Sequence, residues 1–296
     1  MAGEPAPSIS EITKFVAEAV AHAPSVYHTL PWWFSTTDTT TCLHADTERR
    51  LPVIDPAGRE MLISCGAAVF TARVASRYFG VVPEVRLLPH ADIPNLIAEF
   101  SYPSEPKPTS DYERRLFDEI TARADYQGEF DSDRVPSGVI STLAEEAARE
   151  NATLLVLGDE GHRAAMLAVT ATAQVAFGLD SARTGEIAAW EPVRAHLPQN
   201  PGWGAPVAAP STAAGSPGVV TVLATSGDDR VDWVRAGQAL QRILLVASSK
   251  GVSAALSAEA IEFASLREFI RAELVGGDYP QMVLRFGLAA SPDRSA

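Results

Sequence analysis

Two long apolar helices constrain the fold of this 296-residue chain more than any other feature of its sequence. The segment from Gly66 to Val81 aligns without a gap to the segment from Gly237 to Val252, and each carries two glycines at the same separation. Any two alanine-rich core helices can be aligned in this way, so chance similarity is one interpretation. The coincidence of both glycines favours the other, an internal repeat whose two long helices pack together.

Capping residues, turn residues and apolar periodicity predict the other elements. Ser8 and Glu11 have the spacing of a capping box, and the helix that they begin ends before Pro24. Asp55–Gly58 is expected to be a turn before a helix at 59–79, with Gly80 as its C-cap. We expect further helices near 111–123, 137–151, 160–177, 182–193, 229–250 and 258–274, and strands from Trp32 and at 84–88, 96–100, 153–157, 219–225 and 281–288.

Two segments have the composition of connections. Ser101–Ser110 contains three prolines between polar residues, which suits a connector. We therefore divide the chain into an N-terminal half, residues 1–105, and a C-terminal half, residues 106–296. Asn200–Pro217 is dense in Pro, Gly, Ser and Ala and is expected to be a long loop, of the kind that often forms lids or binding segments.

Charge and composition exclude several classes of protein. A formal net charge of −13 without a basic stripe argues against a nucleic-acid partner. No apolar stretch approaches the roughly 20 residues that span a bilayer, and the first eight residues do not read as a signal peptide. The histidines and the two cysteines do not have metal-ligand spacing. We expect a cytoplasmic protein that acts on a small molecule, without a metal or a membrane contact.

Four segments together resemble a known family. Ala23–Trp32, which reads APSVYHTLPW, resembles the Ala-Pro-Ser-x-x-Asn-x-Gln-Pro-Trp turn of FMN-dependent nitroreductases. Asp55–Ala68, Ala236–Leu245 and Tyr279–Gly287 are similar to segments of the Acg-type branch of that superfamily. The segments occur in the family's order and cover most of the chain.

This resemblance implies a fold and an activity. Nitroreductases are homodimers of α+β fold that bind FMN between subunits and reduce nitro-compounds, quinones or flavins with NAD(P)H. The Acg-type branch resembles that dimer fused into one chain, which implies two pseudo-symmetric halves and a monomer or a weak homodimer. The implied protein is a flavoprotein oxidoreductase with FMN as cofactor and NAD(P)H as electron donor. Because the flavin carries the hydride chemistry, no catalytic residue is assigned.

The resemblance also implies a set of cofactor-binding residues. The family's phosphate-binding segment, Arg-x-Ser/Thr-x-Arg/Lys, matches the stretch 123–127, where Arg123 is kept, Asp125 replaces the hydroxyl residue and Gln127 replaces the second cation. A simple surface charge at a helix end is an equally good interpretation of Arg123. The positions implied to line the cofactor cleft are Ser25, His28, Arg123, Gln127 and Arg294.

The departures from the family's pattern leave a second function open. In the turn, His28 stands where the family has Asn, and Leu30 stands where it has Gln and cannot donate a hydrogen bond. A hydrogen bond to a charged group contributes roughly 1.5–3 kcal/mol, so the loss of two or three weakens FMN binding by orders of magnitude. The alternative is therefore a non-catalytic protein of the same fold that binds flavin or another small molecule.

Overall fold

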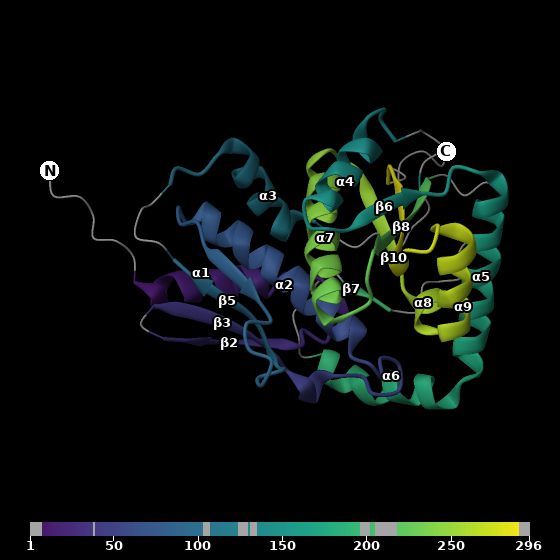
Figure 1. The fold of residues 1–296 in the computed structure, drawn as a ribbon, viewed down its shortest axis with the longest axis horizontal. Coiled ribbons are helices and arrows are strands. Elements are labelled where there is room, and N and C mark those ends of the chain that lie inside the picture. Colours follow the sequence, from purple (N-terminus) through teal and green to yellow (C-terminus); the bar gives the residue numbers. More distant parts are fainter. Residues whose placement is uncertain are drawn as a thin grey trace, which may run out of the picture.

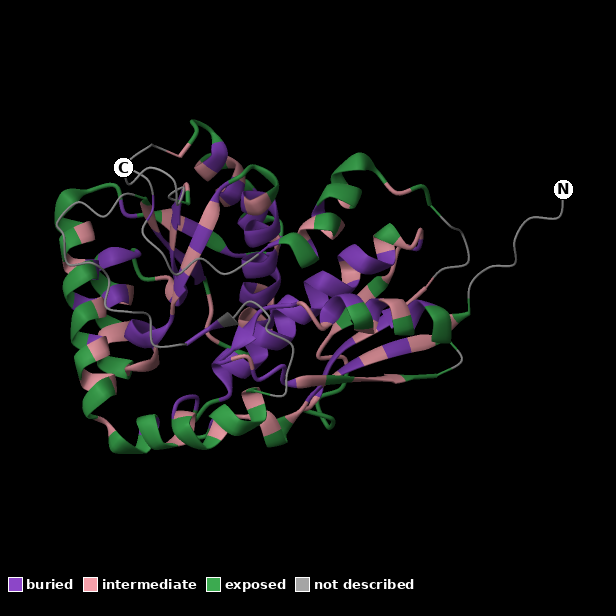
Figure 2. Cartoon of the chain, turned by 180° about the vertical axis from the view of Figure 1, so that it is seen from behind, coloured by how far each residue is buried: buried purple, intermediate pink, exposed green. Residues whose placement is uncertain are grey.

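The computed structural model describes residues 8–37, 39–102, 107–123, 130, 135–195, 202–204 and 218–289 (Figure 1). Helices are combined with two four-stranded antiparallel sheets, which confirms the predicted α+β class. The long helices α2 (Arg59–Tyr78) and α7 (Arg230–Ser249) meet in the middle of the molecule, with one sheet on each side. Most residues of both helices are buried (Figure 2).

The first sheet belongs to the N-terminal half. The helix α1 (Ile9–Val20) begins with the predicted Ser8–Glu11 capping box and buries one apolar face against α2. The sheet has the order β2-β3-β5-β4. Its strands are β2 (Trp32–Thr36), β3 (Thr40–Ala45), β4 (Glu84–Leu87) and β5 (Leu96–Ser101), and the short elements β1 (Ser25–Val26) and η1 (Thr47–Arg49) flank β2 and β3.

The second sheet has the order β6-β8-β10-β9. Its strands are β6 (Thr153–Val156), β8 (Val219–Thr225), β9 (Ser253–Ser257) and β10 (Tyr279–Gly287), preceded by α3 (Asp111–Ala122) and α4 (Val139–Ala148). Two insertions extend this half. The first contains α5 (Glu160–Leu179), α6 (Ser181–Arg194) and β7 (Gly202–Trp203), and the second contains α8 (Glu259–Glu262), α9 (Ala264–Phe269) and the π-helical turn η2 (Ile270–Leu274).

The two halves share one topology. In each, two strands of the four-stranded sheet precede the long helix and the other two follow it, with the last strand placed inside the sheet. The offset that aligns Gly66 with Gly237 also aligns the first and last residues of α2 and α7. Both helices are followed by a glycine of positive φ, Gly80 (94°) and Gly251 (71°), as a left-handed C-terminal cap requires. The repeat expected from the sequence is therefore seen in the fold, while a division at residue 105 stays a prediction.

The two aligned glycines are where the long helices touch. A Cβ atom on Gly66 would lie 2.1 Å from the carbonyl oxygen of Val234, and one on Gly237 would lie 1.9 Å from that of Ile63. These contacts are reciprocal, because the same offset relates Ile63 to Val234 and Gly66 to Gly237. Equivalent residues that meet reciprocally are the mark of a twofold contact. Glycine is needed here because no side chain fits between the two backbones.

Local patterns did not predict every element. Strands β3 and β9 were missed, and the single helix expected at 258–274 is broken into α8, α9 and η2. The break lies at Phe263, whose extended backbone (ψ 115°) allows the side chain of Glu262 to bond to Arg183 of α6. The segment 200–217 is not entirely a loop, because Gly202–Trp203 forms β7 and pairs in parallel with β1. Both corrections arise from contacts that are distant in sequence.

Candidate functional site

The turn that follows β1 has an unusual backbone. Tyr27, His28 and Leu30 have φ angles of 44°, 54° and 44°, in the left-handed region that non-glycine residues rarely adopt. Each such residue costs on the order of 1–3 kcal/mol and persists only where its surroundings hold it. Such strain is concentrated at functional sites, so this turn is the first candidate.

Hydrogen bonds from α2 and from within the turn hold this conformation. Ser64 of α2 accepts a hydrogen bond from the backbone N–H of Val26 (3.1 Å) and donates one to the carbonyl of Glu60 (2.7 Å). The hydroxyl of Ser25 accepts from the N–H of Leu30 (3.1 Å). Cys65, a buried thiol as expected, donates to the carbonyl of Pro31 (3.3 Å), and burial raises the pKa of this thiol. The start of α2 therefore fixes the turn.

The short strand β7 covers the turn. The N–H of Tyr27 donates to the carbonyl of Trp203 (2.7 Å), and the indole of Trp203 is almost fully buried. Gly204 lies so close to the ring of Tyr27 that a Cβ atom would come within 2.4 Å of it. On the other side, the indole N–H of Trp190 in α6 donates to the carbonyl of Tyr27 (3.1 Å). The insertion of the C-terminal half thus closes over the turn of the N-terminal half.

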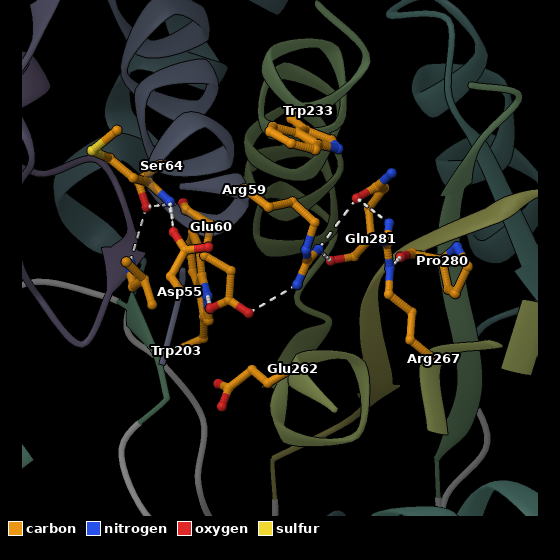
Figure 3. Close-up of polar contacts among 12 residues, drawn as sticks. Asp55, Arg59, Glu60, Ser64, Trp203, Trp233, Glu262, Arg267, Pro280 and Gln281 are labelled. Atoms are coloured by element: carbon orange, nitrogen blue, oxygen red, sulfur yellow. Dashed lines mark hydrogen bonds and ion pairs between the residues drawn. The ribbon is translucent and has the colours of Figure 1, made fainter. Parts of the chain in front are cut away.

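Beneath β7 lies a buried pair of charged residues (Figure 3). Glu60 accepts one hydrogen bond from Arg59 (2.9 Å) and one from the indole N–H of Trp203 (3.0 Å). Arg59 also donates to the carbonyl (3.0 Å) and the side-chain oxygen (3.2 Å) of Gln281 in β10. The pair therefore connects α2 to β10, an inner strand of the second sheet, and to β7.

A second ion pair adjoins this one at Gln281. Arg267 of α9 donates to both carboxylate oxygens of Asp228 (2.8 and 2.6 Å). The amide of Gln281 donates to Asp228 (3.2 Å) and to the hydroxyl of Thr225 (2.8 Å). Burial opposes the ionisation of Asp228, but the bonds from Arg267 and Trp233 outweigh it and hold the pKa of this carboxyl below its ordinary value.

Glu262 adds a further carboxyl group to the buried cluster. Its side chain is 1% exposed and accepts a hydrogen bond from Arg183 (2.7 Å) through one oxygen, while the other oxygen has no hydrogen-bond partner among the described residues. Figure 3 shows this carboxyl group turned toward Glu60 and Trp203. Burial, followed by the charges of Glu60 and Glu259, raises the pKa of Glu262 well above its ordinary value.

Glu60 is expected to make stability depend on pH. Burial raises its pKa to about 7, above the value of about 4.3 in an unfolded chain. The folded state therefore prefers the protonated form, and the stabilisation from this proton is complete below the unfolded pKa and is lost as pH rises toward 7. We expect urea unfolding of the Glu60→Gln variant to show a smaller loss of stability between about pH 5 and about pH 8 than the wild type.

Glu113 supplies a control whose pKa is shifted in the opposite direction. Burial opposes its ionisation, but bonds from Arg77 and Ser110 lower its pKa to about 2, so its stabilisation is present above the unfolded pKa and is lost as pH falls. The Glu113→Gln variant is expected to change the acid side of the profile and to leave the neutral range as it is. Equal slopes for wild type and Glu60→Gln between about pH 5 and about pH 8 would show that Glu60 is ionised throughout.

The residues predicted to bind the cofactor lie in two places. Ser25, which is fully buried, and His28 belong to the strained turn. Arg123 caps the C-terminal end of α3, and this helix packs against α2 and α7. The residue is only 9% exposed, so it is not a surface charge. Gln127 and Arg294 lie outside the described residues. The role of these five residues in cofactor binding stays a prediction.

The buried cluster was not predicted as a site. Arg59, Glu60, Trp203 and Glu262 are its central residues. One feature of the sequence indicates the cluster. Arg59 and Glu60 are adjacent charged residues at the start of a helix whose other residues are almost all apolar or small. Nothing local pointed to Trp203 or Glu262, because both reach the cluster through distant contacts. Within the described ranges, no group of three His, Cys, Asp or Glu residues is arranged to hold a metal ion.

The turn can be tested for its fit to FMN. Every backbone N–H from residue 26 to residue 30 already donates to a protein acceptor, and the Ser25 hydroxyl accepts from within the turn. The ring of Tyr27 is packed against Gly204. With β7 in this position, the turn does not fit the edge of a flavin, and we derive no chemical step through FMN.

Comparison with known proteins shows what the chain is similar to. No family model matches it. A Mycobacterium tuberculosis protein named "Putative NAD(P)H nitroreductase" is 28% identical over 304 residues, which cover 95% of this chain and 86% of that protein. The "Putative NAD(P)H nitroreductase acg" of the same organism is 24% identical over 307 residues, which cover 95% of this chain and 90% of that protein.

Solved nitroreductase structures align with part of this chain. A nitroreductase with bound FMN from Desulfitobacterium hafniense aligns with a TM-score of 0.40 and 16% identity, over 60% of this chain and 90% of that one. The FMN-dependent nitroreductase NfnB from Mycobacterium smegmatis, in complex with NADPH, aligns with a TM-score of 0.38 and 17% identity, over 60% and 89%.

The sequence relatives are named putative NAD(P)H nitroreductases, so the chain is similar to nitroreductase-like proteins at 24–28% identity over most of its length. Within that class, the resemblance to the Acg-type branch is confirmed, because Acg itself is among the relatives and the similarity extends over nearly the whole chain.

Proposed function

We propose that the chain is an NAD(P)H-dependent oxidoreductase of nitroreductase type, with FMN as its redox group and a small nitroaromatic, quinone or flavin as electron acceptor. The observation that carries this proposal is the strained turn from Ser25 to Leu30. It has the family's sequence frame and is fixed to the start of α2 by Ser64. The full-length similarity to proteins named putative NAD(P)H nitroreductases supports it.

A specific observation favours a second function. The N–H groups of the turn are engaged and β7 lies on it, as in a protein that no longer holds FMN tightly. The alternative is a non-catalytic binder of flavin or another small molecule. FMN binding at the turn, with or without catalysis, needs β7 to leave it, whereas a binder of another small molecule does not need that movement.

The test removes β7 from the turn without touching the predicted cofactor residues. In the Gly204→Ala variant, the new Cβ would collide with the ring of Tyr27. Because this ring is buried, we expect β7 rather than the ring to move. We expect FMN to bind this variant at least roughly tenfold more tightly than the wild type, because the competing closed state is weakened. Fluorescence titration with FMN measures the affinity, and absorbance of NAD(P)H measures its oxidation with and without added FMN.

Gly80→Ala is the matched control. Gly80 also has positive φ (94°) but, within the part of the chain that the structure describes, no neighbouring atom within 4 Å of its Cβ position, so the variant strains the backbone away from the turn. Its FMN affinity should equal that of the wild type. FMN-dependent NAD(P)H oxidation by wild type or Gly204→Ala supports the oxidoreductase, and FMN binding without oxidation supports the binder. A colourless wild type and a variant that fails to bind FMN would exclude flavin chemistry at this turn.

A further inference from the structure

Helices α5 and α6 form an arm on the outer edge of the molecule (Figures 1 and 2). The two helices are bent by 76° relative to each other. The inner side of α5 is part of the core, because Met166, Val169 and Ala173 are buried in an apolar cluster with α8 and β10. Its outer side is exposed over the whole length of the helix (Figure 2).

The outer face of α5 is apolar and uncharged. From Ala164 to Leu179 the helix contains no charged residue. Leu167, Val175 and Leu179 are 50%, 64% and 81% exposed. The exposed residues of this stretch, which together are the α5 face, are Ala164, Leu167, Ala168, Ala171, Thr172, Val175, Gly178 and Leu179. Contiguous exposed apolar patches of this kind mark interaction sites.

We propose that the α5 face is an isologous interface between two copies of this chain. Residues four positions apart form rows on a helix surface. One row of the face, Leu167–Ala171–Val175–Leu179, carries the larger side chains and forms a ridge. The neighbouring row, Ala164–Ala168–Thr172, carries small side chains and forms a groove beside it. A face that supplies both the ridge and the groove complements itself, as a twofold interface requires.

Electrostatics restricts where two copies can meet. With a formal net charge of −13, two copies repel each other over most of their surfaces. Contact through the α5 face brings no like charges together. On α6, the exposed apolar residues include Ala188, Ala189 and Val193. An interface limited to this arm is small, so we expect a weak dimer with a dissociation constant in the micromolar range.

A lipid surface is the competing occupant. Among the described residues, no single helix is long and apolar enough to cross a membrane, and only the bent pair of α5 and α6 meets the criteria of length and composition. The arm formed by α5 and α6 is therefore where the chain would contact either a second copy or a lipid surface. The experiments below distinguish a second copy from a lipid surface.

The first experiment measures association in solution. Sedimentation velocity of the full chain from low to high micromolar concentration is expected to show monomers converting to dimers. Val175→Glu should abolish the dimer, because two carboxylates would then be buried at the interface. Ile93→Glu, which adds the same charge at a residue 41% exposed and outside the arm, should dimerise as the wild type does. Circular dichroism checks that both variants are folded.

The second experiment locates the twofold axis. Ala171 lies in the middle of the ridge, so Ala171→Cys on a Cys42→Ser background should form a disulfide-linked dimer under mild oxidation, while Gly185→Cys on α6 should do so much less. Wild type that stays monomeric at all concentrations overturns the proposal. So does dimerisation that survives Val175→Glu. Binding of the monomer to vesicles of phosphatidylcholine and phosphatidylglycerol, lost in Val175→Glu, would assign the face to lipid and also overturn it.

Discussion

Replacement of Gly237 by alanine is expected to prevent folding or to lower the free energy of unfolding by more than roughly 3 kcal/mol. The added Cβ would lie 1.9 Å from the carbonyl oxygen of Ile63 and 2.8 Å from the Cα of Gly66. These are backbone atoms of a buried helix, so the clash is relieved only if α2 and α7 move apart. That movement opens the core between the two halves. Gly66→Ala should have the same effect, because the contact is reciprocal.

The control for this experiment is Gly185→Ala. Gly185 lies inside the exposed helix α6, and no described residue outside its own helix backbone has an atom within 4 Å of its Cβ position. Here alanine should stabilise the protein by up to about 1 kcal/mol, because it has the better helix propensity. Thermal and urea unfolding of the three variants test the argument. A soluble Gly237→Ala protein with the stability of the wild type would show that the two helices do not cross in contact at these glycines.

Replacement of Arg59 by methionine is expected to lower the free energy of unfolding by about 3–5 kcal/mol, the usual cost of breaking a buried ion pair by removing one partner. The change leaves Glu60 buried without its cation and removes the hydrogen bonds to Gln281. Because Glu60 then gains more from its proton, the loss should be larger at about pH 8 than at about pH 5. Urea unfolding at the two pH values measures both effects.

Two comparisons isolate the cause. Arg86→Met breaks the pair of Arg86 with Glu99, but this arginine side chain is 66% exposed, so the expected loss is below about 1 kcal/mol. The double variant Arg59→Met with Glu60→Gln should regain part of the lost stability, because no charge is left unpaired. If the double variant is less stable than Arg59→Met alone at both pH values, the buried charge of Glu60 is not what destabilises the single variant.

Elements whose conformation depends on residues adjacent in the sequence were predicted correctly. Strand β8 has its predicted bounds, the predicted Ser8–Glu11 capping box is present, and Gly80 has the positive φ expected after α2. Strand β9 was missed and Phe263 interrupts a predicted helix, because a sheet partner and an ion pair from elsewhere in the chain decided their conformations. Local preferences amount to tenths of a kcal/mol per residue, and tertiary contacts readily override them.

For the candidate site, the division between sequence and tertiary structure is clear. The sequence alone determined the two long helices, the alignment of their glycines and the family frame of the turn, because periodicity, caps and turn residues act on their immediate neighbours. Only the tertiary structure decided that β7 lies on that turn and that Arg59, Glu60 and Glu262 are buried together. Those features depend on which surfaces are removed from water when the chain closes on itself. Burial and pairing between segments far apart in the chain leave no local pattern by which they could be predicted.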